Sequence, residues 1–281
     1  MNTAEYLNKW AISYKDDIIN NIMPFWMKYG LDKEHGGVYT CVNRDGSLMD
    51  TTKSVWFQGR FGFIAAYAYN NIEKNPQWLA ASKSCIDFIE AHCFDTDGHM
   101  FFEVTEDGVP LRKRRYVFSE GFAAIAMAEY SLATGEKEYA EKALEIFKRT
   151  QHFLDTPGML EPKYLPAMSS RGHSITMILI NTASRIRMVI DDPVLTEQID
   201  ASISALRKYF IHPEFKALLE MVGSDGEFID TCNGRVINPG HCIETAWFIM
   251  EEAKYRNWDK GLLQLALQIL DWSWEWGWAK E

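Results

Sequence analysis

The sequence predicts an all-α fold in which helical hairpins repeat along the chain. Short segments rich in Gly and Asp precede long stretches with helical periodicity, and this arrangement recurs. Glycines mark the repeat at intervals of about 60 residues, roughly one hairpin and its connection. They are Gly59, Gly121, Gly172 and Gly240. An apolar helical face accompanies the repeat, formed by Ile199, Ile203, Leu206 and Phe210.

The predicted elements begin with one N-terminal helix from about residue 3 to 28. Four hairpins follow it, which gives about nine helices. Turns or short β-hairpins are expected at 35–46, 97–108 and 224–234. Helix starts follow them at 56–60, 117–121 and 237–241, and a weaker copy of the same pattern lies at 169–173. A ring of such hairpins brings their helix starts toward one mouth, and with them Arg60, Glu120, His173 and His241.

Composition narrows the functional classes. The formal net charge of −10 argues against nucleic acid and anionic membranes as main partners. The N-terminus lacks the pattern of a signal peptide, and no apolar run reaches membrane-spanning length. Five scattered cysteines without metal-type spacing indicate reduced thiols in a cytoplasmic protein. Aromatic residues make up 14% of the chain, which suits sugar stacking or an ordinary large core.

The segment from Asn238 to Glu244 carries the clearest chemical signal. Asn238 is a good helix cap, Pro239 suits the first turn, and the three-residue step places His241 beside Glu244. The helix dipole disfavours an imidazolium there, while a nearby carboxylate favours it. This histidine is therefore a candidate proton carrier near neutral pH. The alternative is a polar helix start without chemistry.

Two motifs resemble the N-acylglucosamine 2-epimerase family, which includes cellobiose 2-epimerases, mannose isomerases and the renin-binding protein. The first is Lys53-x-x-Trp56-Phe57-Gln58-Gly59-Arg60, and the second is Asn238-Pro239-Gly240-His241-x-x-Glu244-x-x-Trp247. The resemblance runs from about residue 5 to the end of the chain. It implies an (α/α)6-type toroid, in which twelve helices form two rings and the active site lies at one mouth.

The resemblance also implies roles for individual residues. His241 corresponds to one of two histidines that move the proton at C2 of a sugar, and Glu244 orients or polarises it. Arg60 corresponds to an arginine that contacts substrate oxygens near the reacting carbon. Tyr116 lines the pocket, and His173 lies near a position where cellobiose epimerases carry a histidine. The predicted substrate site also includes Trp56 and Glu120.

Each of these roles has a structural alternative. Arg60 could be a buried arginine stacked on Trp56, and His173 a satisfied core histidine. Tyr116 and Glu120 could belong to an ordinary polar helix start. The predicted reaction needs no metal and no redox cofactor, and the sequence contains no convincing cluster of metal ligands.

The length of the chain differs from the family pattern. Six hairpins need roughly 360 residues on the repeat spacing, whereas this chain has 281. We therefore expect a single domain over 1–281 that lacks its C-terminal hairpins and the second catalytic histidine. An open toroid exposes apolar helix surface, which favours self-association. The resemblance adds the expectation of a homodimer.

The leading functional hypothesis is a sugar 2-epimerase or isomerase that interconverts N-acetylglucosamine and N-acetylmannosamine, or a related reducing sugar. One alternative is a glycoside hydrolase on the same helical toroid, with Glu120 and Glu244 as its two carboxylates. Another is an inactive, truncated homologue that binds sugar or associates with itself without turnover.

Overall fold

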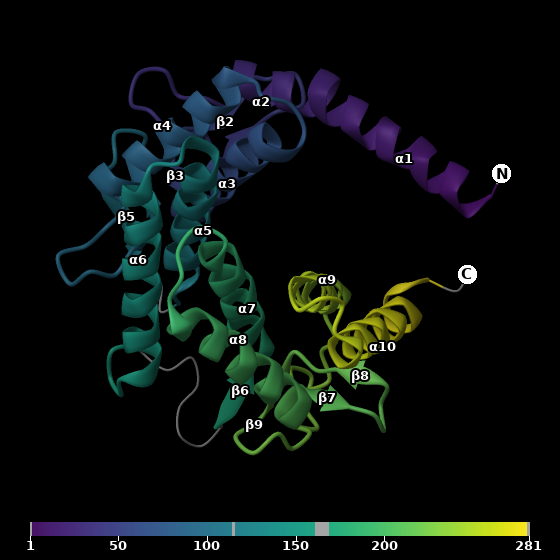
Figure 1. The fold of residues 1–281 in the computed structure, drawn as a ribbon. Coiled ribbons are helices and arrows are strands. Elements are labelled where there is room, and N and C mark those ends of the chain that lie inside the picture. Colours follow the sequence, from purple (N-terminus) through teal and green to yellow (C-terminus); the bar gives the residue numbers. More distant parts are fainter. Residues whose placement is uncertain (1, 114–115, 161–168, 280–281) are drawn as a thin grey trace. The chain divides into compact units, whose positions relative to one another are not determined.

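The computed structural model describes residues 2–113, 116–160 and 169–279. The chain divides into two compact units, Met1–Leu160 and Glu161–Glu281. Helices dominate both units, and the strands between them are short (Figure 1). None of the helices in the described ranges is both long enough and apolar enough to cross a lipid bilayer.

The first unit begins with a helix that changes its winding partway along. Helix α1 (Thr3–Asp17) continues through a π-helical turn, Ile18–Ile22, into α2 (Met23–Tyr29). Pro24 explains the change, because proline offers no N–H to the helical ladder and its ring clashes with the carbonyl of the preceding turn. The N–H of Met23 accordingly bonds five residues back, to the carbonyl of Ile18. The predicted N-terminal helix is thus present, with a local interruption.

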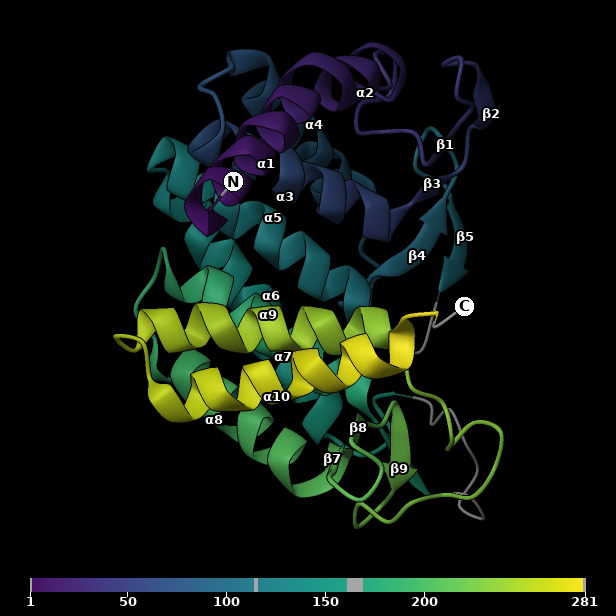
Figure 2. The ribbon, with the colours of Figure 1, turned by 90° about the vertical axis from the view of Figure 1, so that its right-hand side faces the viewer.

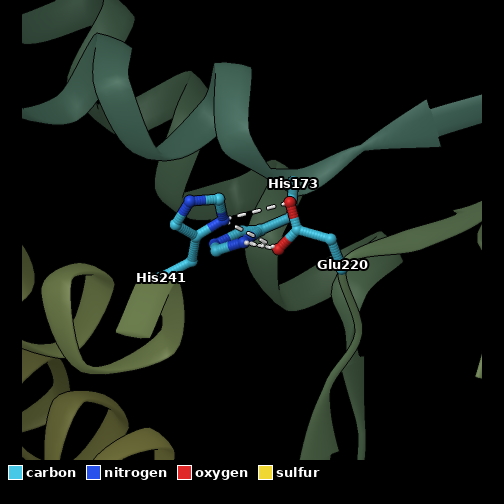
Figure 3. Close-up of side chains that lie close together, drawn as sticks. All are labelled: His173, Glu220 and His241. Carbon is cyan, nitrogen blue, oxygen red and sulfur yellow. Dashed lines mark hydrogen bonds and ion pairs between the residues drawn. The ribbon is translucent and has the colours of Figure 1, made fainter. Parts of the chain in front are cut away.

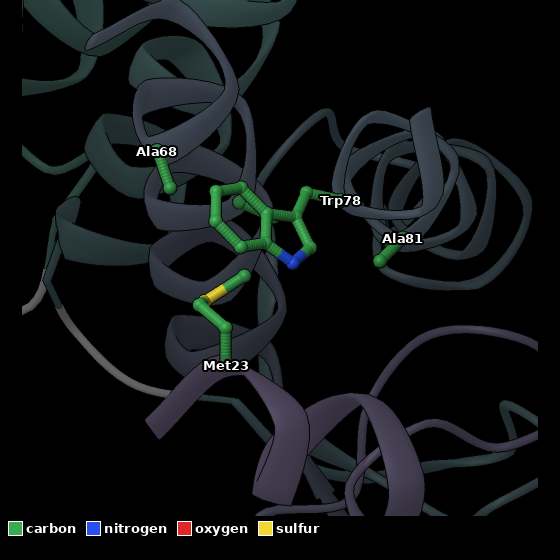
Figure 4. Packing of buried hydrophobic residues seen from close by; sticks show 5 residues of the cluster. Met23, Ala68, Trp78 and Ala81 are labelled. Carbon is green, nitrogen blue, oxygen red and sulfur yellow. The ribbon is translucent and has the colours of Figure 1, made fainter. Parts of the chain in front are cut away.

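Two helical hairpins follow in this unit, α3 (Val55–Asn71) with α4 (Pro76–His92), and α5 (Phe118–Thr134) with α6 (Lys137–Asp155). The N-terminal helix packs on the first hairpin through a buried apolar cluster. Figure 4 shows Trp78 of α4 next to Met23 and to Ala68 of α3, with Ala81 on the same helix. Burial of these side chains fixes α2 against α3 and α4.

Short strands precede the first helix of each hairpin. Strands β1 (Cys41–Val42) and β2 (Leu48–Asp50) pair with each other, and β3 (Lys53–Ser54), β4 (Phe101–Val104) and β5 (Pro110–Lys113) form a second antiparallel sheet. Gly46 and Gly108 turn these hairpins with φ of 88° and 92°, a region that favours glycine. The turns expected around 35–46 and 97–108 are confirmed.

Gly59 allows α3 and α5 to approach closely. A Cβ added at this position would lie 2.6 Å from the backbone carbonyl carbon of Phe122, which cannot move independently of α5. By contrast, a Cβ at Gly172, which marks the same repeat, would meet no atom within 4 Å.

Replacing Gly59 by Ala is expected to lower the free energy of unfolding by about 1–3 kcal/mol, because the helices must separate. Gly172→Ala serves as the control and should change it by less than about 0.5 kcal/mol. Urea denaturation of the two variants measures both values. Equal stability of the two variants would contradict the close approach at Gly59.

The second unit contains two further hairpins. Helix α7 (His173–Arg187) precedes α8 (Pro193–Ala205), which continues as a π-helical turn, Leu206–Phe210. Helices α9 (Pro239–Tyr255) and α10 (Lys260–Gly277) lie side by side (Figure 2). The predicted apolar face is confirmed, since all four of its residues are buried: Ile199, Ile203, Leu206 and Phe210.

Two small antiparallel sheets support α7 and α9. Strand β6 (Ser170–Gly172) pairs with β9 (Met221–Gly223), and β7 (Ile211–His212) pairs with β8 (Ala217–Leu218). If the N-terminal segment counts as one helix, the described residues contain the nine helices that the repeat predicts. The all-α hairpin fold is thereby confirmed, whereas a single domain over 1–281 stays a prediction.

Candidate functional site

His241 lies in the first turn of α9, as the motif predicts. Asn238 caps the helix, its side-chain oxygen accepting a hydrogen bond from the N–H of His241 at 3.3 Å, and Pro239 is the first helical residue. The thiol of Cys242 donates to the carbonyl of Leu218 and ties this turn to β8. The position of the imidazole is therefore set by a helix start anchored on the small sheet.

The carboxylate beside His241 is that of Glu220, which the sequence analysis did not identify. Glu220 lies directly before β9, and the β6–β9 register pairs Gly172 with Met221. The N–H of His173 donates to the carbonyl of Glu220 at 3.0 Å and continues that pairing. Strand register thus places Glu220 next to both histidines.

Figure 3 shows the Glu220 carboxylate facing both imidazole rings, with dashed lines that join it to each of them. Nδ1 of His241 lies 3.1 and 3.0 Å from its two oxygens, and Nδ1 of His173 lies 3.6 Å from Oε2. A carboxylate only accepts hydrogen bonds, so His241 carries a proton on Nδ1 and, when neutral, a lone pair on Nε2. With 35% of its side chain exposed, His241 is accessible from solvent.

Electrostatics favours an ionised Glu220. Burial raises the pKa of this carboxyl group, but contacts with His173 and His241 outweigh burial and lower the pKa to about 2. The N-terminus of α9 disfavours an imidazolium at His241, while the carboxylate favours it. These opposed influences suit a histidine that takes up a proton and gives it back.

The lowered pKa of Glu220 predicts a pH dependence of stability. Because the folded-state pKa lies below the reference value of 4.5, its contribution is fully present above about pH 4.5 and is lost as the pH falls toward 2. Near neutral pH, the free energy of unfolding of the wild-type chain should exceed that of the Glu220→Gln variant by up to about 3 kcal/mol. Denaturation of both proteins across this range measures the difference, and a constant difference would contradict the prediction.

His173 is confirmed near His241 but is fully buried, with 0% of its side chain exposed. Its Nε2 lies 2.9 Å from the hydroxyl oxygen of Thr245, which in turn donates to the carbonyl of His241. Complete burial argues against the predicted contact of His173 with a sugar. Burial and the contact at Nε2 agree with the alternative of a core histidine, except that Nδ1 has no hydrogen-bond partner among the described residues.

Glu244 does not occupy the position that the motif suggested. It is half-buried on α9, whereas the hydrogen bond at Nδ1 of His241 goes to Glu220. Adjacency on one helix face therefore did not identify the carboxylate that contacts Nδ1 of His241. A sequence signal for Glu220 did exist, because it is a lone carboxylate inside the apolar segment 217–222, whose other residues are all buried.

The remaining predicted site residues belong to the first unit. Trp56 makes aromatic contacts with Phe102, Phe118 and Phe122, and Tyr116 contacts Phe118 edge to face. Arg60 is exposed and lies over the ring of Phe122 at 4.4 Å, so the alternative of a buried arginine on Trp56 is wrong. A common mouth for these residues and His241 stays a prediction.

Glu120 is buried, with 1% of its side chain exposed. One of its oxygens accepts a hydrogen bond from the N–H of Met100 at 2.8 Å. Gln58, in the same place relative to its repeat glycine, accepts one from the N–H of Val38. The repeated contact anchors a preceding turn to a helix start, which argues for a structural role of Glu120 instead of sugar binding.

Repeated helical hairpins, with a histidine–carboxylate pair at the start of one helix, place the chain in the class of proteins built from α-helical hairpin repeats. Residues 37–281 match the model of the N-acylglucosamine 2-epimerase family. Human N-acylglucosamine 2-epimerase is 30% identical over 254 residues, which cover 88% of this chain. The mouse enzyme of that name is 29% identical over 95% of this chain. The chain belongs to the N-acylglucosamine 2-epimerase family.

Solved structures support the fold. Cellobiose 2-epimerase from Spirochaeta thermophila matches 98% of this chain and 72% of its own, with a TM-score of 0.82 and 20% identity. The corresponding protein from Bacillus thermoamylovorans gives a TM-score of 0.84, also at 20% identity, over 95% of this chain and 72% of its own. This chain spans 64% and 59% of the length of the mouse and human relatives, respectively.

Proposed function

We propose that this chain acts on a free reducing sugar by moving the proton at C2, as a 2-epimerase or isomerase. The observation that carries the proposal is the hydrogen bond from Nδ1 of His241 to Glu220, which leaves the basic lone pair of the neutral ring on Nε2. Glu220 also stabilises the imidazolium that forms when Nε2 accepts a proton.

The chemistry accounts for the groups involved. In the open-chain sugar, the aldehyde acidifies the C2 proton, and its removal leaves an enediolate with negative charge on the carbonyl oxygen. His241 is the proposed base. Arg60 is the proposed partner of that oxygen, because a guanidinium stays charged and offers several donors. Trp56 and Tyr116 are proposed to line the pocket.

Epimerisation requires a second step. The enediolate must regain a proton on the opposite face of C2, which calls for a second acid. Exchange of the C2 proton with solvent therefore requires only His241, whereas formation of the epimer requires both His241 and the second acid. The two readouts separate a working base from a complete reaction.

N-acetylglucosamine and N-acetylmannosamine are the first proposed substrates, because four curated relatives carry the name N-acylglucosamine 2-epimerase. Other relatives are named cellobiose 2-epimerase. The test is proton NMR of the purified chain in D2O with N-acetylmannosamine, N-acetylglucosamine, mannose and cellobiose. Loss of a C2 proton signal supports the proposal, and the absence of exchange with every sugar would overturn it.

A glycoside hydrolase on the same fold is less well supported. Its chemistry needs two opposed carboxylates that reach the scissile bond. Glu120, one of the two candidates for that role, is buried and bonded to the backbone of Met100. The fold alone does not determine the reaction.

A further inference from the structure

Three potential metal ligands converge in the second unit. They come from His173, Glu220 and His241, each of which offers one ligand atom, a ring nitrogen or a carboxylate oxygen, within 4.8 Å of the other two. Nδ1 of His173 and Nδ1 of His241 lie 3.6 and 3.0 Å, respectively, from Oε2 of Glu220. Zn²⁺ bonds of about 2.0–2.2 Å place neighbouring tetrahedral ligands roughly 3.3–3.6 Å apart, so both nitrogen–oxygen distances suit one ion with small adjustments.

The ring of His173 supplies an independent observation. Its Nδ1 is buried and has no hydrogen-bond partner among the described residues. Its Nε2 faces the hydroxyl of Thr245, whose own proton goes to the carbonyl of His241. The hydroxyl oxygen must then accept from Nε2–H. A charged His173 also donates from Nδ1 toward Glu220, which is a contact that lowers the pKa of that carboxyl, whereas the neutral ring directs the lone pair of Nδ1 at the carboxylate. Two acceptors that face each other inside a protein suit a cation between them.

We propose that His173, Glu220 and His241 form a binding site for Zn²⁺ or a similar divalent transition metal. Two imidazoles and a carboxylate are the ligands of many such sites. Mg²⁺ and Ca²⁺ are less suited to this group, because they prefer oxygen ligands to imidazole nitrogens. Thr245 holds His173 in the ligating tautomer, as outer-sphere partners of metal-bound histidines do. The partial exposure of His241 and Glu220, 35% and 22%, gives the ion access and leaves room for a water ligand.

The consequence for catalysis rests on the proposed function. A metal on Nδ1 of His241 displaces the proton from that nitrogen to solvent, and Nε2 takes up one proton, so the ring stays neutral. The lone pair on Nε2 of His241, which would abstract the C2 proton, is then occupied by a proton. The metal-bound chain should be inactive, and removal of the metal should restore proton exchange.

Zinc binding is tested directly, without any sugar, on the full chain stripped by a chelator. Cys41 and Cys232 are replaced by Ser in all samples, because exposed thiols also bind zinc. Competition with a chromophoric chelator should show one ion per chain. His241→Gln and Glu220→Gln should each weaken binding more than Thr245→Val, which should cost about 10–100-fold. Circular dichroism verifies the folding of each variant.

His212→Gln is the matched control. Its ring also contacts a carboxylate, with Nδ1 lying 2.8 Å from Glu214, but the metal-ligand group contains neither residue. This variant should keep the full affinity for zinc. Failure of the chain to bind zinc would overturn the inference, and so would binding unaffected by both His241→Gln and Glu220→Gln.

The activity measurement separates the inference from the proposed function. C2 exchange in the metal-free chain that zinc abolishes and chelator restores supports both. Zinc binding at these residues without exchange by the metal-free chain supports the metal site and counts against the proposed function. Exchange that continues with the site saturated would overturn the inhibitory role.

Discussion

Replacing Glu220 by Gln is expected to lower the rate of C2 proton exchange by about 10²–10⁴-fold. The amide is uncharged, so it no longer stabilises the imidazolium of His241. Its NH2 group can also donate to Nδ1, which would move the ring proton to Nε2 and remove the base. The measurement is the exchange rate in D2O at saturating sugar, with circular dichroism to verify folding.

Two variants identify the cause of that loss. Glu214→Gln removes the carboxylate from another histidine–glutamate pair, that with His212, and should leave the rate unchanged. Glu244→Gln tests the carboxylate that the sequence motif suggested, and its effect should be smaller than that of Glu220→Gln. A large loss in Glu244→Gln with normal activity in Glu220→Gln would contradict the assignment of the orienting carboxylate.

Replacing Lys53 by Met is expected to lower the free energy of unfolding by about 3–5 kcal/mol. The Lys53 side chain is fully buried, and its ammonium group donates to Oδ2 of Asp32 at 2.7 Å and to the carbonyls of Gly36 and Glu106 at 2.8 and 2.7 Å. These three acceptors use all three donors of the ammonium group. Methionine leaves Asp32 buried without its counter-charge.

The electrostatics of Asp32 agree with this expectation. Burial raises the pKa of Asp32, but hydrogen bonds from Lys53 and from the N–H groups of His35 and Glu34 lower it below its usual value. Lys113→Met is the control, since Lys113 also pairs with two carboxylates but is 34% exposed. The free energy of unfolding of Lys113→Met, measured by chemical denaturation, should decrease by only about 0–1 kcal/mol. A similar decrease in the free energy of unfolding of the two variants would contradict the stabilising role of the buried Lys53–Asp32 ion pair.

The sequence predicts the hairpin repeat well because the repeat depends on local chemistry. Turn glycines, helix caps and apolar periodicity act over a few residues, and the start of α9 at Asn238 follows from those signals. The π-helical turn before Pro24 has a local cause as well, but its form depends on how the freed backbone groups are satisfied.

The contacts of the site depend on pairing between distant segments. Glu220 reaches His173 through the register of β6 with β9, and Lys53 reaches Asp32 through the fold of the intervening turns. Spacing along one helix favoured Glu244 as the partner of His241, because neighbours on a helix are visible in the sequence and strand partners are not. For such distant contacts, the sequence still offers one signal, which is a carboxylate or a lysine isolated among residues that are expected to be buried.

The most direct test of the account is the rate at which the metal-free chain exchanges the C2 proton of N-acetylmannosamine in D2O, compared with that of His241→Asn. We predict exchange by the wild-type chain and a loss of at least about 10²-fold in the folded variant. Exchange at the wild-type rate in His241→Asn would contradict the role of His241 as the base.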